Sequence, residues 1–203
     1  MPRPRSDIEP RIVEAARALF LKDGVDGASL RAIAAAAGTS IGMVYYYFPS
    51  KDELFLAVVE ERYEALVADL DRALTPELSV RERLERMFER FAAVSPEEIQ
   101  VIKLVLREAL VSSERLERIV ERFKRGHVPL ILRTVFDGFA DGTFDRSLHP
   151  VVVVLSAVAL AGPAQVIRAV AGQRLPLPAG PGGNELAHAL VGVLLSGVGA
   201  KVG

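Results

Sequence analysis

Three consecutive tyrosines, Tyr45 to Tyr47, are followed closely by Lys51 in a stretch that contains no acidic residue from Gly27 to Lys51. Phenol hydroxyls and a lysine ammonium group are hydrogen-bond donors that suit phosphate oxygens. An ordinary solvated surface gives no reason to gather three tyrosines at one place. The composition of this stretch therefore indicates a surface that faces a polyanion.

The second half of the stretch predicts a short helix that begins after Ser40. The Ser40 side chain can cap the helix by accepting a backbone N–H bond, and Val44 and Phe48, four residues apart, would pack inward. The sequence Pro49-Ser50-Lys51 stops this helix and starts another. The side chains that then stay outside are Ile41, Met43, Tyr45 and Tyr46.

The first half predicts another short helix, capped by Ser29 and closed by Gly38. Its Leu30, Ile33 and Ala34 are expected to face a core, and a glycine suits the left-handed position that ends many helices. Two short helices around a glycine turn make a helix-turn-helix, a motif whose second helix enters the major groove of DNA.

Residues 6 to 60 resemble the DNA-binding head of the tetracycline-repressor-like (TetR/AcrR) family of bacterial transcriptional regulators. The matching marks are Ala-Leu-Phe and then Asp-Gly at the end of a first helix, Ser-Leu-Arg-Ala-Ile-Ala, Gly-Thr-Ser at the turn, and Tyr-Tyr-Tyr-Phe-Pro-Ser-Lys-Asp-Glu-Leu. Their order and spacing together are more specific than a single helix-turn-helix pattern. The rest of the chain matches only in length and helical character, so the resemblance identifies a head and no effector.

The resemblance implies an all-α fold in which an N-terminal three-helix head is joined by a long helix to a helical body. We expect the DNA-binding domain at residues 1–50 and the effector-binding and dimerisation domain at residues 51–203. The first 51 residues carry seven Lys or Arg and five Asp or Glu, a net charge of +2, and the remainder carries −3. This modest asymmetry has the sign expected when only the head meets phosphates.

Ten residues of the head are expected to contact DNA. Those expected to face phosphates are Ser29, Arg31, Tyr45, Tyr46 and Lys51, and those expected closest to base edges are Thr39, Ser40, Ile41, Gly42 and Met43. Any single one of them can instead be only a cap or a packing residue. Many relatives carry a basic or amide side chain where Ile41 stands, so Ile41 and Met43 are expected to contact thymine methyl groups. Arg3 and Arg5 form either a minor-groove arm or a frayed terminus.

Apolar spacing and helix-start signals predict the remaining helices. We expect them at Glu9 to Lys22, from the Ser50 cap through Leu74, after Ser79, from Ser95-Pro96, from Glu114 to Phe139 with a kink at Gly126 to Pro129, from the His149 cap, and from Glu185 to Val198 after a Pro/Gly-rich loop at 172–184. The charged residues after Ser79, Arg83 among them, are expected to face water. The same holds for most of Gln100, Lys103, Arg107 and Glu108.

The last two predicted helices are apolar almost all round, so part of their surface is expected to meet another subunit. In the family that the head resembles, the last two long helices pack as a four-helix dimer interface. The family also holds its effector inside the body. The side chains that we consider for this site are Tyr63, Met87, Phe88, Phe91, Phe123 and His127, although ordinary core packing is the favoured interpretation of each. They favour an apolar or aromatic effector.

Other kinds of site find little support in the sequence. The chain has no cysteine, its three histidines lie far apart, and it has no phosphate loop, dinucleotide fingerprint or nucleophile elbow. We therefore expect no metal, no cofactor and no enzyme activity. The uncharged run from Val151 to Ile167 has 17 residues, fewer than the ~20 of a membrane span. The N-terminus lacks the apolar stretch of a signal peptide, which favours a cytoplasmic location.

Together these features predict a homodimeric transcriptional regulator that binds double-stranded operator DNA. We expect a repressor that a small-molecule effector releases, because blocking a promoter requires only occupancy. One alternative is a DNA-binding factor that is independent of ligand or regulated by another protein. The other is a helical small-molecule binder that does not bind DNA.

Overall fold

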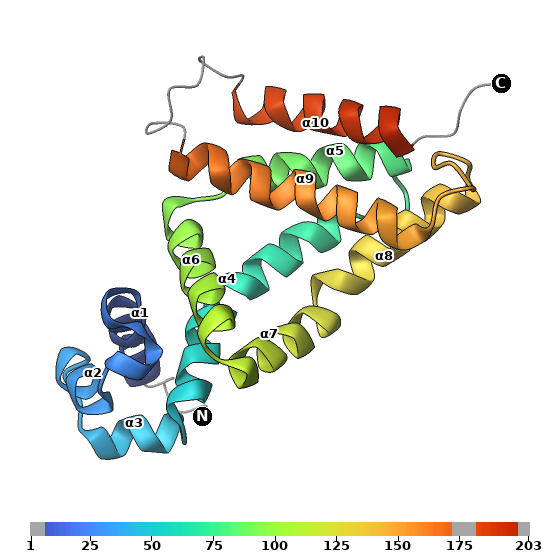
Figure 1. Ribbon diagram of the computed structural model, residues 1–203. Coiled ribbons are helices and arrows are strands. Elements are labelled where there is room, and N and C mark those ends of the chain that lie inside the picture. Colours follow the sequence, from blue (N-terminus) through green and yellow to red (C-terminus); the bar gives the residue numbers. More distant parts are fainter. Residues whose placement is uncertain (1–6, 172–181, 199–203) are drawn as a thin grey trace, which may run out of the picture. The chain divides into compact units, whose positions relative to one another are not determined.

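A computed structural model describes residues 7–171 and 182–198 (Figure 1). All regular structure in these residues is α-helical, which confirms the expected fold class. The chain forms two compact units: the first comprises residues 1–65 and 96–122, and the second comprises residues 66–95 and 123–203. Arg3 and Arg5 and most of the predicted loop at 172–184 lie outside the described residues. The functional boundary expected at residue 50 stays a prediction.

The first unit contains the three helices of the head, the start of the helix that follows them, and two helices that come much later in the sequence. These elements are α1 (Ile8–Gly27), α2 (Leu30–Ala36), α3 (Ile41–Tyr47), the start of α4 (Lys51–Ala73), α6 (Pro96–Val111) and most of α7 (Ser113–Arg125). Helix α1 packs against both α2 and α6, and α2 packs against α3. Fully buried side chains of this unit include Ile12, Ala16, Phe20, Ile33, Val44 and Phe55.

Helix α1 is broken near its end. Gly24 has φ +83° and ψ 165°, which is outside the helical region, and a last turn follows to Gly27. The left-handed φ is open to glycine at little cost. The sequence prediction that the regular helix ends at Asp23-Gly24 is therefore confirmed, and the break leaves backbone groups that need other partners.

The second unit packs the end of α4 with α5 (Val80–Ala92), α8 (His127–Ala140), α9 (Pro150–Ala171) and α10 (Gly183–Val198). Helix α5 contacts α8, α9 and α10, and α9 contacts α8 and α10. The core they enclose contains Leu84, Met87, Phe88, Phe144, Val153, Ala157 and Val191. Among the described helices, none combines the length and the apolar character that crossing a bilayer requires.

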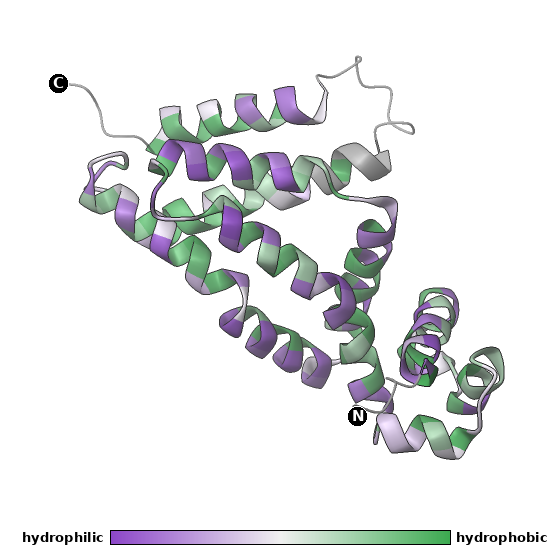
Figure 2. Cartoon of the chain, turned by 180° about the vertical axis from the view of Figure 1, so that it is seen from behind, coloured by the Kyte–Doolittle hydropathy of each residue, from purple (hydrophilic) through white to green (hydrophobic). Residues whose placement is uncertain are grey.

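Helix α5 shows how the sequence fixes one of these elements. The Ser79 hydroxyl accepts a hydrogen bond from the Glu82 backbone N–H, and the Glu82 carboxylate accepts one from the Ser79 N–H, which completes a capping box. Apolar residues then recur every three or four positions and face the core. Hydrophilic and hydrophobic segments accordingly alternate along the helix in Figure 2.

Of two further helix predictions, one needs correction and one is confirmed. The single helix expected from Glu114 to Phe139 is two helices, α7 and α8, because Gly126 adopts a non-helical conformation (φ −108°, ψ −110°). Pro129 then falls in the first turn of α8, where a missing N–H costs nothing. The cap expected before α9 is confirmed, since His149 Nδ1 accepts a hydrogen bond from Val151 N–H at 3.3 Å.

The expectation that Arg83 faces water is wrong. Its side chain is buried in the second unit, where Nε donates to the Leu78 carbonyl at 2.9 Å and Nη2 donates to the Pro76 carbonyl at 3.2 Å. The remaining nitrogen, Nη1, pairs with Asp137 of α8. A buried guanidinium is tolerated because each nitrogen has an acceptor.

Gly138 of α8 offers a test of packing in the second unit. A Cβ atom built there would overlap the Phe144 ring and lie 3.1 Å from Val80 Cγ1. We expect Gly138→Ala to lower the free energy of unfolding by about 1–3 kcal/mol through overpacking. Urea denaturation measures this. The control is Gly197→Ala on α10, where a Cβ would have nothing within 4 Å, and equal midpoints for the two variants would contradict the expectation.

Candidate nucleic-acid interface

The turn between α2 and α3 is a complete helix-ending motif. Gly38 has φ +62°; its N–H donates to the Ala35 carbonyl at 3.1 Å, and the Thr39 N–H donates to the Ala34 carbonyl at 3.0 Å. This pair of bonds is the Schellman arrangement, which needs a left-handed residue where Gly38 stands. The turn therefore sets the angle at which α3 leaves α2.

Serine caps fix the start of each short helix. Ser29 Oγ accepts a hydrogen bond from Ala32 N–H at 3.0 Å, and Ser40 Oγ accepts one from Met43 N–H at 3.3 Å. Ser50 caps α4 in the same way, through Glu53 N–H at 3.1 Å. The two caps of the helix-turn-helix were both expected, and a capping hydroxyl still has its own hydrogen to donate.

Helix α3 buries one face and exposes the other. Val44 is fully buried and Phe48, just beyond the helix, is 7% exposed, whereas Ile41 is 38%, Tyr45 52% and Tyr46 77% exposed. Tyr47 is half-buried, and its ring meets that of Tyr46 edge-on at 5.2 Å between centroids. The exposed side of α3 thus presents two phenol groups and an aliphatic side chain.

The ten residues expected to contact DNA lie between Ser29 and Lys51, in or beside α2 and α3, but their exposure differs. The exposed ones are Ser29, Arg31, Ser40, Ile41, Gly42, Tyr45 and Tyr46, and the half-buried ones are Thr39, Met43 and Lys51. Lys51 Nζ donates to the Asp26 carbonyl at 3.0 Å, so part of its hydrogen-bonding capacity serves the fold. Among the described residues, Arg31 of α2 has no comparable hydrogen bond to the fold. It is therefore the clearest cation for a phosphate.

An ion cluster in the first unit, with a buried arginine at its centre, consists of Arg115, Asp26, Asp52 and Glu108, and we call it the Arg115 cluster. Arg115 Nε donates to Asp52 at 2.8 Å, Nη1 donates to Glu108 at 2.7 Å and to Asp26 at 3.2 Å, and Nη2 also binds Asp26. The side chains of Arg115 and Glu108 are 8% and 3% exposed. The guanidinium of α7 thereby joins α6 to both ends of the helix-turn-helix segment.

The sequence prediction missed this cluster. Most of the four polar residues of α6 were expected outside, which holds for Gln100 and Lys103, but Glu108 is buried and Arg107 is half-buried. Glu108 continues the inward stripe of Val101 and Leu104, and Arg115 shares an inward stripe with Ile119. A charged residue at an inward position of an apolar stripe was the signal that could have revealed the cluster. The prediction instead assigned these residues to the surface because they are charged.

The pKa of Asp26 lies below its ordinary value because its carboxylate accepts hydrogen bonds from Arg115. The positive charges of Arg115 and Lys51 act in the same direction, and partial desolvation opposes them. The Asp26 hydrogen bonds likewise raise the pKa of Arg115, so the pair stays ionised over the whole physiological range.

Comparison with known proteins identifies the head. A family model described as "Bacterial regulatory proteins, tetR family" matches residues 12–58, the residues that contain α2, the glycine turn and α3. The head is therefore similar to the DNA-binding part of the tetR family. The nicotine-responsive transcriptional repressor HdnoR of Paenarthrobacter nicotinovorans is 34% identical over 87 residues, which cover 43% of this chain and 45% of that protein. The transcriptional activator FasR of Mycolicibacterium smegmatis is 29% identical over 113 residues, covering 56% and 52%.

Solved structures extend the likeness to the body, but as fold alone. The fatty acid degradation regulator FadR of Bacillus halodurans superposes with a TM-score of 0.76 at 19% identity and covers 98% of this chain and 100% of that one. FadR of Bacillus subtilis, in complex with stearoyl-CoA, gives 0.75 at 17% identity and covers 93% and 98%. This chain thus aligns with about half of the two curated relatives above and with nearly all of these two structures.

The residues expected at an effector site divide between the two units. In the second unit Met87 and Phe88 belong to the buried core, Phe91 packs against it, and the Phe123 and His127 rings lie 4.9 Å apart. In the first unit Tyr63 is buried, and the Arg122 guanidinium lies 4.5 Å from its ring centroid. A role in effector binding stays a prediction for all six.

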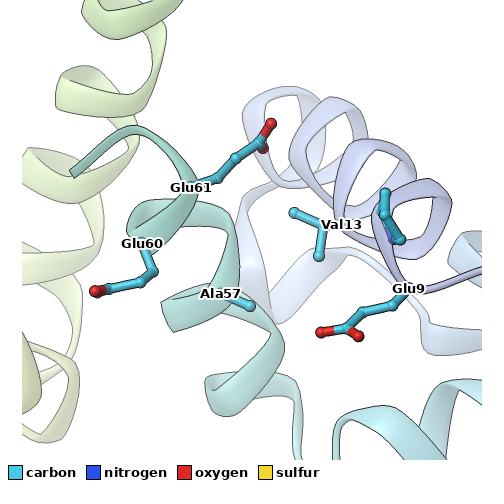
Figure 3. Close-up of a pocket in the computed structure, with 6 residues that line it drawn as sticks. Glu9, Val13, Ala57, Glu60 and Glu61 are labelled. Carbon is cyan, nitrogen blue, oxygen red and sulfur yellow. The ribbon is translucent and has the colours of Figure 1, made fainter. Parts of the chain in front are cut away.

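A hollow of about 430 Å³ in the first unit lies between α1 and α4 of the tetR-type head (Figure 3). Its lining combines the apolar side chains of Val13 and Ala57 with the carboxylates of Glu9, Glu60 and Glu61. Glu60 is already bound by Arg122 of α7. Within the described residues no group of three or more His, Cys, Asp or Glu could hold a metal ion.

The Asp26 pKa predicts how acid acts on the first unit. A carboxylate with a lowered folded-state pKa contributes stability above its unfolded pKa of about 3.9, and that contribution is lost as pH falls through the lower folded value. We expect Asp26→Asn to lower the urea midpoint near neutral pH, and the difference from the unchanged protein to shrink below about pH 4.

Asp23→Asn is the control for that measurement, because Asp23 is exposed on the same stretch of α1 and no bond to Arg115 is recorded for it. A difference between Asp26→Asn and the unchanged protein that grew toward acid would contradict the expectation.

Proposed function

We propose that this chain is a sequence-specific transcriptional regulator that binds operator DNA as a homodimer. The observation that carries the proposal is the exposed side of α3, where Ile41, Tyr45 and Tyr46 project from an acid-free segment of a tetR-type head. An exposed aromatic pair without neighbouring carboxylates suits the phosphate backbone of DNA.

In this proposal α3 enters the major groove and α2 lies against the backbone. Arg31, Tyr45 and Tyr46 donate to phosphates and set the register of the head. Ile41 and Gly42 come closest to base edges, and because neither side chain can donate a hydrogen bond, recognition there depends on thymine methyl groups and groove shape.

The dimer would form through α9 and α10. Six large apolar side chains of these helices are between 42% and 63% exposed: Val151, Val152, Leu155, Val158, Ile167 and Val193. Between them stand small residues such as Ala159 and Gly192, and a Cβ at Gly192 would have nothing within 4 Å. A large apolar surface interrupted by small residues allows two helix pairs to approach closely. Two heads in one dimer would then read half-sites about 34–36 Å apart, or a multiple of that.

Regulation by a small molecule is the further part of the proposal. HdnoR is nicotine-responsive and the B. subtilis FadR structure contains stearoyl-CoA, and by analogy an apolar or amphipathic effector would favour a conformation of this protein that binds DNA poorly. We propose repression as the output, in the cytoplasm and without enzyme activity. Activation is the alternative output, because FasR is named a transcriptional activator.

Selection of duplexes from a random pool, followed by fluorescence anisotropy on the winning sequence, tests DNA binding directly. We expect tight binding with a steep salt dependence, and loss of affinity in Tyr46→Ala. Arg31→Ala should lower the salt slope by about one unit, because one phosphate contact is removed. The matched control is Lys103→Ala on α6, which removes one exposed positive charge from the same unit outside the head.

Two results would count against the proposal. One is a pool from which no sequence is enriched. The other is an identical salt slope for the Arg31→Ala and Lys103→Ala proteins combined with full affinity in Tyr46→Ala, which would place the DNA contact elsewhere.

Leu155 tests the dimer. Its side chain is 63% exposed on α9, and we expect Leu155→Glu to shift the protein toward monomer, because a carboxylate would be buried in an apolar interface. Sedimentation velocity measures the shift, and affinity for a two-half-site duplex should fall with it. Leu110→Glu on α6, where the side chain is 90% exposed, should leave the dimer intact. If the Leu155→Glu protein stayed dimeric, the prediction that α9 lies in the dimer interface would be wrong.

A further inference from the structure

We propose that Arg115, although it lies on α7 outside the head, is a positioning residue for DNA binding: it clamps the two carboxylates that bracket the helix-turn-helix segment. The inference rests on the proposed function and deepens it, because it names the contact through which the rest of the first unit controls the head.

The bracket is visible in both sequence and structure. The acid-free segment from Gly27 to Lys51 contains α2, the glycine turn and α3, and it is immediately preceded by Asp26 and followed by Asp52. Arg115 binds Asp26 with Nη1 and Nη2 and Asp52 with Nε. One guanidinium therefore closes a loop of 25 residues that carries every residue we expect to touch DNA.

Only an arginine can make this closure. A guanidinium has donors in a rigid planar fork, whereas a lysine ammonium group is a compact point charge on a flexible stem. Glu108 holds the fork from α6, since its Oε2 accepts from Arg115 Nη1 at 2.7 Å and its side chain is 3% exposed. Glu108 thus helps to orient the Arg115 guanidinium toward the two aspartates.

Glu108 also joins α6 to the break in α1. In a regular helix Val25 N–H would pair with the Leu21 carbonyl. After the break at Gly24, Val25 N–H donates to Glu108 Oε1 at 3.2 Å, and the Leu21 carbonyl accepts from Arg107 Nη1 at 3.4 Å. The two consecutive residues of α6 therefore satisfy backbone groups that the break exposes, just before the segment that Arg115 closes.

Two physical effects of Arg115 predict opposite results when the aspartates are removed. If Arg115 only neutralised Asp26 and Asp52, deleting both carboxylates would strengthen DNA binding, because two negative charges near phosphates would be gone. If Arg115 clamps the segment, deleting them weakens DNA binding in spite of the charge gain. We commit to the clamp, because Asp26 has a 69% exposed side chain and water already screens its charge.

The clamp has a reciprocal consequence. Because Arg115 binds both ends of the DNA-reading segment, a displacement of α7 changes the geometry of the head. By linkage, DNA bound to the head must then stabilise α7 in its clamped position. Amide hydrogen exchange in α7 reports this, and mere structural support for folding would not produce a DNA-dependent change there.

The test compares variants of the full-length protein on the duplex selected above. We expect Arg115→Met to lower affinity by about tenfold or more, the size of one lost charge-assisted hydrogen bond or more, and Arg115→Lys to be nearly as weak. Asp26→Ala with Asp52→Ala should also weaken binding. The matched control is Arg122→Met, because Arg122 lies two turns further along α7 and binds Glu60 of α4, outside the segment that Arg115 closes. It should stay within about twofold of the unchanged protein.

Active protein is counted by stoichiometric titration, so that partial unfolding is not read as weak binding. In the unchanged protein the duplex should slow amide exchange in α2 and α3 and also in residues 113–122, and the second effect should vanish in Arg115→Met.

Three outcomes would overturn the clamp: tighter binding by the double aspartate variant, full affinity in Arg115→Lys, or equal affinities for Arg115→Met and Arg122→Met. In each of these the unchanged protein still binds its duplex, so the proposed function survives. If the unchanged protein selects no duplex and shows no protection of α2 and α3, the proposed function fails and the clamp falls with it.

Discussion

Backbone hydrogen bonding at the broken end of α1 constrains the whole first unit. The left-handed Gly24 turns the chain toward α2, and the groups around it need partners that α1 does not supply. Those partners come from α6, about 85 residues later in the sequence, through Arg107 and Glu108. A helix from the body is therefore part of the same compact unit as the head. The order of elements in the chain and the order of elements in space differ for this reason.

The head was the most predictable part because its signals are local. Ser29, Ser40 and Ser50 cap the helices they were expected to cap, and Gly38 takes the left-handed conformation that the turn requires. Each of these features is decided by bonds within a few residues. The end of the regular part of α1 at Gly24 and the His149 cap of α9 were predictable on the same grounds.

Long-range pairing was what the sequence concealed. Arg83, Glu108 and Arg115 are buried because acceptors or donors from distant segments meet them, and no local pattern reveals those partners. Charged residues were assigned to the surface by type, whereas their positions on inward stripes decided the outcome. The break at Gly126 was underestimated for a related reason: Pro129 was read as a kink inside one helix, but it fits the first turn of a new one. The aromatic residues of the body are similarly ambiguous, since a core and an effector site use the same side chains.

Gly42 occupies the second position of α3, and the fold does not require a glycine there. A Cβ at this position would meet only the Ser40 hydroxyl, at an ordinary 3.8 Å, and the backbone is helical. Glycine inside a helix is even unfavourable by roughly 0.5–1 kcal/mol relative to alanine. Residue 42 can therefore be varied together with its exposed neighbour Ile41 without rebuilding the head. For the DNA binding proposed above, residues 41 and 42 are therefore the natural positions to diversify when a different preferred sequence is wanted.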